Sequence, residues 1–223
     1  MNRHTRLVDF QVHARRSGLA EGEQKPLNEA LFSTFEPVRL WLKDRAIEGP
    51  FRKIAISLAA DSSSARWHGN VSNAIGLCQV TEAVVLSELL QNAGDHRWVL
   101  GIVQHALKCV TQSTNWRSDE LDSFIADVSG RTLPLVHFFD GLARVERASR
   151  IRCVPWLSTH PGETQIGVRI GERDVRVLSA PGPIYLEDSF PLAKSTIQER
   201  AYVLLDKAGK ALATVPIDSA DMH

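Results

Sequence analysis

Apolar and polar residues alternate in two segments of the first sixty residues, which is the pattern of half-buried strands. The alternation covers residues 8–14 and returns over residues 51–59. Between these segments the apolar residues recur with helical spacing. We expect two helices there, over residues 26–37 and 38–48, because Pro37 removes a helical hydrogen bond and interrupts the run.

Helical spacing dominates the middle of the chain. Residues 61–76 are rich in serine, asparagine and glycine, and they predict a long surface loop. Residues 80–91 favour a helix, although Val84-Val85-Leu86 also fits a strand. The clearest helical stripe covers residues 99–110, and another helix is expected from the N-cap Ser118 to the stop at Gly130.

Beyond Arg131, short apolar runs separated by turn residues predict strands, and residues 202–217 predict a hairpin with Gly209 at a positive φ. Helices over about residues 26–130 and a β-rich part over about residues 131–218 indicate an α+β fold. We expect a largely antiparallel β-sheet with a layer of helices from the middle of the chain. No long linker is visible, so residues 1–223 are interpreted as a single domain.

Composition narrows the function classes. The 223 residues hold 26 basic and 26 acidic side chains, so the general positive charge of a nucleic-acid-binding or membrane-surface protein is missing. No apolar run reaches the roughly 18–20 residues that span a bilayer, and the N-terminus lacks the apolar core of a signal peptide. The three cysteines are far apart, as in proteins with reduced thiols. We expect a cytoplasmic protein that contacts neither membrane nor nucleic acid.

No recognisable motif indicates catalysis, a cofactor or a metal. A glycine-rich phosphate loop and a nucleophile elbow are both absent. Zinc ligands are expected as closely spaced cysteine or histidine pairs, whereas His96 and His105 stand nine residues apart. Cys109 lies on an apolar helical stripe and is interpreted as a core residue. We therefore expect no catalytic residue, cofactor or metal ligand, apart from groups that only folding would bring together.

Charge and tryptophan placement indicate a binding surface instead. Residues 61–130 hold 4 basic and 8 acidic side chains within a chain of no net charge, and such a field can steer a basic partner. Trp67 and Trp116 lie in polar segments beside arginines, and tryptophan and arginine are enriched at binding hot spots. The candidate partner-binding residues are Asp61, Arg66, Trp67, His68, Trp116, Arg117, Asp119 and Glu120.

The order of these segments resembles that of immunity proteins encoded beside bacterial polymorphic toxins. The resemblance rests on the strand over residues 51–56, the helix over 98–107 that leads to Asn115-Trp116, and the hairpin over 202–210. It implies a protein that binds a cognate toxin and neutralises it by covering the toxin's active site. Toxins that act on nucleic acid tend to be basic around that site, which suits the acidic middle segment.

Two other function classes stay open. The first is a hydrolase or nuclease whose site is assembled in space from His68, His137 or His160 with nearby carboxylates. The second is a chaperone or adaptor for a secreted effector, which would bind an unfolded or terminal segment rather than a folded domain. Our first hypothesis is the immunity protein, a binding protein without chemistry of its own.

Overall fold

The chain divides into two compact units. The computed structural model describes residues 5–16, 19–60, 69–74, 76–114, 116, 119–132, 134–160, 163–186, 188 and 190–218. Unit 1 is Met1–Leu133, and unit 2 is Pro134–His223. The sequence was interpreted as a single domain that changes from a helical to a β-rich part at residue 131. The boundary between the two units lies just beyond this position. Helices and largely antiparallel sheets confirm the α+β class.

Unit 1 is built on a four-stranded mixed sheet. Its strands are β2 (Asp9–Arg16), β4 (Lys53–Ala60), β6 (Leu77–Val84) and β5 (Gly69–Ala74), in that spatial order. β2, β4 and β6 run parallel, whereas β5 pairs antiparallel with β6. The short strands β1 (Thr5–Arg6) and β3 (Glu48–Gly49) pair separately. The parallel pairing of β2 with β4 follows from the long helix between them, which returns the chain to the end where β2 began.

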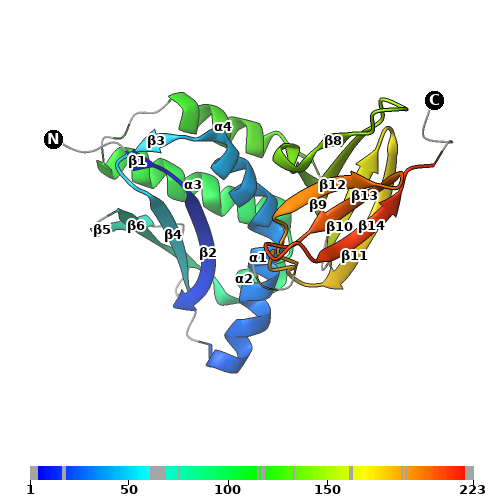
Figure 1. Ribbon diagram of the computed structural model, residues 1–223. Helices are drawn as coiled ribbons and strands as arrows, with labels where there is room; N and C mark the ends of the chain where they lie inside the picture. Colours follow the sequence, from blue (N-terminus) through cyan, green and yellow to red (C-terminus); the bar gives the residue numbers. More distant parts are fainter. Residues whose placement is uncertain are drawn as a thin grey trace. The chain divides into compact units, whose positions relative to one another are not determined.

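The helices of unit 1 lie on one side of this sheet (Figure 1). They are α1 (Glu21–Arg45), α2 (Leu86–Asn92), α3 (His96–Thr114) and α4 (Asp119–Ser129). Phe10 of β2 packs on Phe35 of α1 with ring centroids 5.1 Å apart. α3 and α4 carry the apolar stripes that the sequence predicts, and both stripes are buried.

The prediction of two helices interrupted at Pro37 is wrong. α1 runs without a break through both Pro26 and Pro37. Its middle is held by tertiary packing, since Leu31, Val38 and Leu42 are at most 1% exposed. Burial of this face outweighs the hydrogen bond that a proline removes from a helix interior. α1 also begins at Glu21, five residues before the expected start at residue 26.

The segment after β4 contains more strand than its composition indicates. Residues 61–68 of the expected loop lie outside the described residues, whereas residues 69–74 form β5. The helix expected over 80–91 is also wrong in its first half, because β6 continues to Val84 and α2 begins at Leu86. Gly76, at φ 70°, makes the tight turn between β5 and β6.

Unit 2 is formed by two antiparallel sheets. The larger contains β7 (Leu135–Phe138), β9 (Arg152–His160), β10 (Glu163–Ile170) and β11 (Arg173–Pro181), in the order β11-β10-β9-β7. The short 3-10 helix η1 (Asp140–Leu142) follows β7 in the sequence. It is followed by β8 (Arg144–Val145), which also pairs with β9. The smaller sheet has the order β12 (Lys194–Gln198), β13 (Ala201–Leu205) and β14 (Ala211–Pro216). β13 and β14 confirm the predicted hairpin, and Gly209 has φ 84°.

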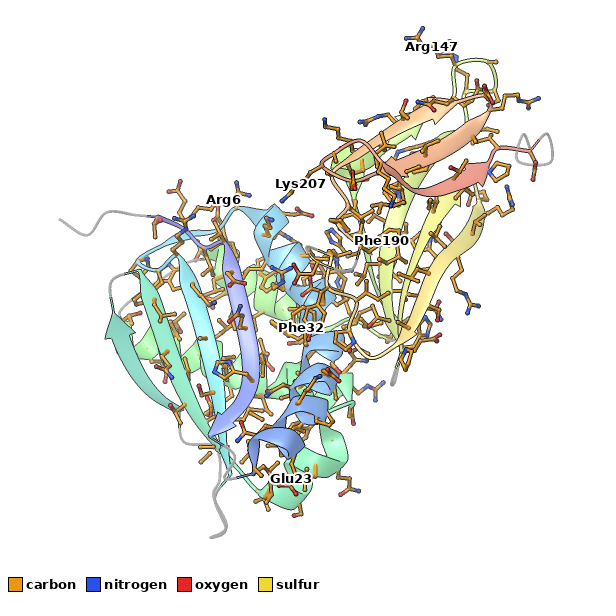
Figure 2. The ribbon with its side chains drawn as sticks, turned by 60° about the horizontal axis from the view of Figure 1, so that its bottom comes forward. Arg6, Glu23, Phe32, Arg147, Phe190 and Lys207 are labelled. Atoms are coloured by element: carbon orange, nitrogen blue, oxygen red, sulfur yellow. The ribbon has the colours of Figure 1, made fainter. Side chains whose placement is uncertain are left out.

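Unit 2 has a hydrophobic core of its own. Side chains of both sheets and of the segment before β12, where Phe190 is labelled in Figure 2, contribute to it. Its buried members are Ile151, Cys153, Leu157, Ile166, Val168, Ile170, Ile184, Phe190, Tyr202, Leu204, Val215 and Ile217. The hydroxyl of Tyr202 donates to the carbonyl of Leu142 at 2.6 Å, which joins β13 to the end of η1. Burial raises the pKa of this phenol to about 12.

Candidate functional site

Most of the predicted partner-binding surface falls outside the described residues. This applies to Asp61, Arg66, Trp67 and His68, and also to Arg117. Their assignment to a binding surface stays a prediction. Trp116, Asp119 and Glu120 are described, and they differ from one another in exposure.

Trp116 is a core side chain, which differs from the expectation of a tryptophan presented to a partner. Its residue is 6% exposed, and its ring meets Phe51 edge-on with centroids 6.5 Å apart. The ring also lies against the backbone of Gly49 in β3, where an added Cβ would overlap it. A glycine is therefore required at this contact. The residues next to Trp116 in the sequence are polar and do not indicate that it is buried. The residues that it packs against, Gly49 and Phe51, are far from it in the sequence.

The first turn of α4 is an exposed acidic surface. Asp119, Glu120 and Asp122 are all exposed and lie within four successive positions at the N-terminal end of the helix. None of the three forms an ion pair with a described residue. Asp127, two turns further on, differs because it binds Arg45 at 2.8 Å and Arg131 at 3.1 Å. Three of the eight acidic side chains of residues 61–130 thus lie in this turn.

A second cluster joins α3 to β6. Glu82 of β6 is fully buried, and its two carboxylate oxygens lie 3.0 and 3.2 Å from Nδ1 of His105. Sγ of Cys109, one helical turn beyond His105, lies 3.9 Å from the same nitrogen. Among the described residues, these three form a group of possible metal ligands, with all ligand atoms within 4.8 Å of one another. The expectation of paired cysteines or paired histidines leaves out the mixed spacing His105-x₃-Cys109, so this group was not predicted.

A polar network lies on the face of the unit 1 sheet opposite the helices. Nε2 of His13 in β2 lies 3.0 Å from Oγ of Ser57 in β4, and the Gln79 amide donates to this hydroxyl at 3.3 Å. Strand alternation explains the placement, since His13 and Ser57 are register partners and their neighbours Val12 and Ile56 face the helices. Ser57 is 0% exposed, so its hydroxyl is not offered to solvent as a nucleophile.

The histidines proposed for a spatially assembled active site have different surroundings. His68 lies outside the described residues. His137 is buried and its ring stands edge-on to that of Phe139, with centroids 4.7 Å apart. His160 lies at the end of β9, where Nε2 is 3.1 Å from Oγ of Ser158.

A carboxylate completes the surroundings of His160. Glu163 begins the next strand, and its pKa is lowered, first by a hydrogen bond from the Ser179 hydroxyl, then by one from Gln165, with smaller contributions from Arg176 and His160. Ser158 is only 3% exposed. The group therefore brings a histidine and a glutamate together, as the sequence-based alternative requires, and the serine beside them is buried.

Comparison with known proteins gave no match to any family model, curated protein or solved structure. Within the part of the chain that the structure describes, no helix combines the length and the apolar character needed to cross a membrane.

Proposed function

We propose that this protein is an immunity protein that binds a cognate bacterial toxin and neutralises it through the acidic first turn of α4. The observation that carries the proposal is the exposure of Asp119, Glu120 and Asp122 without a described ion-pair partner. A carboxylate at a helix N-terminus stabilises the helix, so helix stability alone would explain one acidic residue in this turn. Three exposed carboxylates in one turn concentrate negative potential on a small rigid surface.

A basic toxin surface is the partner that such a turn would attract. Complementary charge raises association rates and disfavours wrong partners, and its effect falls as salt screens it. The turn is rigidly placed, because Leu121, Phe124 and Ile125 of the same helix are buried in unit 1. The proposed surface is therefore preorganised before the partner arrives, which lowers the entropic cost of binding.

Buried hydroxyls support a binding role without chemistry. In the described part of the chain, the two serine–histidine pairs are Ser57 with His13 and Ser158 with His160. A nucleophile must meet its substrate, and both serines are at most 3% exposed. These pairs are better explained as hydrogen bonds that satisfy buried polar groups.

The immunity function is tested by asking whether this protein protects bacteria from toxic products of the genes beside its own. The chain is co-expressed with each neighbouring product that is toxic by itself, and we expect it to restore growth and to form a stoichiometric complex. Reversing Asp119, Glu120 and Asp122 to lysine should weaken that complex at least tenfold, and most strongly at low salt.

Glu88→Lys is the matched control. Glu88 is an exposed carboxylate in the first turn of α2. Its reversal therefore also places a positive charge at a helix N-terminus, but away from the first turn of α4. Equal affinity of the triple variant and Glu88→Lys for the toxin would refute the α4 surface. Growth that is never restored would refute the immunity function. Binding of an unfolded effector segment would instead identify a chaperone, and activity on a substrate by the chain alone would identify an enzyme.

A further inference from the structure

The position of Glu82 is chemically unusual. β6 alternates between partly exposed and buried residues, and Cys78, Val80 and Val84 occupy the buried positions beside Glu82. The face that holds them is covered by helices, so a carboxylate stands where the pattern calls for an apolar side chain. Burying a carboxylate is costly unless a positive charge and hydrogen bonds compensate for it.

α3 brings two further ligand types to this carboxylate. His105 and Cys109 are one helical turn apart, so their side chains lie on the same face of α3 beside the buried stripe. Both are partly exposed, and the His105 side chain is 36% exposed. The cluster therefore has a buried end at Glu82 and an end that solvent reaches.

We propose that Glu82, His105 and Cys109 bind a zinc ion. Zinc takes carboxylate oxygen, imidazole nitrogen and thiolate sulfur at about 2.0–2.3 Å, which places ligand atoms roughly 3–4 Å from one another. The distances from Nδ1 of His105 to the Glu82 oxygens, 3.0 and 3.2 Å, and to Sγ of Cys109, 3.9 Å, match this spacing. A metal ion would bind the carboxylate, the imidazole and the thiolate together, in place of the Glu82–His105 ion pair and the Cys109–His105 contact.

The ligand set selects the metal. Ca²⁺ and Mg²⁺ require oxygen ligands, and a thiolate with an imidazole favours zinc. Cys109 would bind as thiolate and His105 as neutral imidazole through Nδ1, with the displaced protons released to solvent. Three protein ligands leave one tetrahedral position for water or for a group from a partner. This inference is independent of the proposed immunity function.

Thiol protection in the full-length wild-type protein tests the site. Of the three cysteines, Cys78 and Cys153 are buried and Cys109 is partly exposed, so iodoacetamide should modify Cys109 first in the native protein. After chelator treatment and removal of the chelator, we expect one equivalent of Zn²⁺ to slow this modification at least tenfold. Peptide mass spectrometry identifies the modified cysteine. Modification at an unchanged rate in saturating Zn²⁺ would overturn the proposal.

Variants separate the site from adventitious zinc binding. Co²⁺ replaces zinc as a coloured probe, and we expect a thiolate-to-cobalt charge-transfer absorption that Cys109→Ser abolishes. Glu82→Gln and His105→Asn should weaken Zn²⁺ binding at least tenfold, since each removes one ligand. His160→Asn, at a partly buried histidine of unit 2, is the control and should bind as the wild type does. Equal affinity of His105→Asn and the wild type would show that the three residues hold no metal.

Discussion

At the scale of single residues, contacts made in space decide the role of a side chain. Trp116 stands between polar residues in the sequence, yet it fills the space between Phe51 and the backbone of Gly49. The Trp116 ring therefore stabilises the folded state of unit 1. Trp98, which lies on the apolar helix α3, is by contrast only partly buried.

Trp116→Ala should lower the free energy of unfolding by about 3–5 kcal/mol, because it removes a large buried ring and leaves a cavity. Trp98→Ala, at a less buried position, should cost less. Chemical denaturation followed by circular dichroism measures both. Equal losses for the two variants, or a loss below about 1 kcal/mol for Trp116→Ala, would contradict the assignment of Trp116 to the core.

At the scale of one structural element, the turn between β8 and β9 is fastened by a carboxylate. Oε2 of Glu146 accepts hydrogen bonds from the hydroxyl and the backbone N–H of Ser149, both at 2.6 Å. Arg150 adopts φ 62°, a left-handed conformation that the turn has to maintain. Figure 2 shows Arg147 at the tip of this turn. The Ser149 hydroxyl and the Ser149 and Ala148 N–H groups lower the pKa of Glu146 to about 2.

This turn predicts a pH dependence of stability. The folded pKa of Glu146 lies below the ordinary value of 4.5, so the ionised carboxylate favours the folded state. Its contribution is present above pH 4.5 and is lost as the pH falls toward about 2. The difference in unfolding free energy between the wild type and Glu146→Gln should therefore shrink over this range.

Denaturation of the wild type, Glu146→Gln and the control Glu172→Gln at several pH values measures this effect. Glu172 is exposed in the turn between β10 and β11, so its variant removes the same charge without affecting Glu146. A wild-type advantage over Glu146→Gln that does not change between pH 5 and pH 2 would contradict the proposed role of the turn.

At the scale of the whole molecule, the two units differ in how their cores are made. Unit 1 buries one face of a mixed sheet beneath four helices, whereas unit 2 fills the space between two antiparallel sheets. The buried members of the unit 2 hydrophobic core named above all come from residues 151–217. A core that draws on a single segment is the property expected of an independently folding domain.

A fragment of residues 134–223 should therefore fold by itself. Trp156 is the one tryptophan in this segment, so its fluorescence follows the fragment without interference. We expect a β-rich circular dichroism spectrum and a single cooperative unfolding transition detected by both probes. A fragment with a random-coil spectrum would show that unit 2 depends on unit 1.

The sequence predicted those elements whose periodicity is local. β2, β4, α3, α4 and the hairpin of β13 and β14 follow from alternation, helical stripes and turn residues, and the α+β class follows from their order. Pro37 misled the prediction because its effect on an isolated helix is local, while the packing that holds α1 together is not. β6 was misassigned over its second half, since a strand buried on one face and a helix segment can share a short apolar run.

The sequence by itself determined the fold class, the acidic middle segment and the exposed carboxylates of α4, because each depends on neighbours along the chain. Only the tertiary structure decided that Trp116 is buried and that Glu82 meets His105 and Cys109. His105 and Cys109 share a helix and their spacing was visible, but Glu82 lies 23 residues before His105. Whether such distant residues meet depends on how α3 packs on β6, and packing is a property of the whole fold rather than of local sequence.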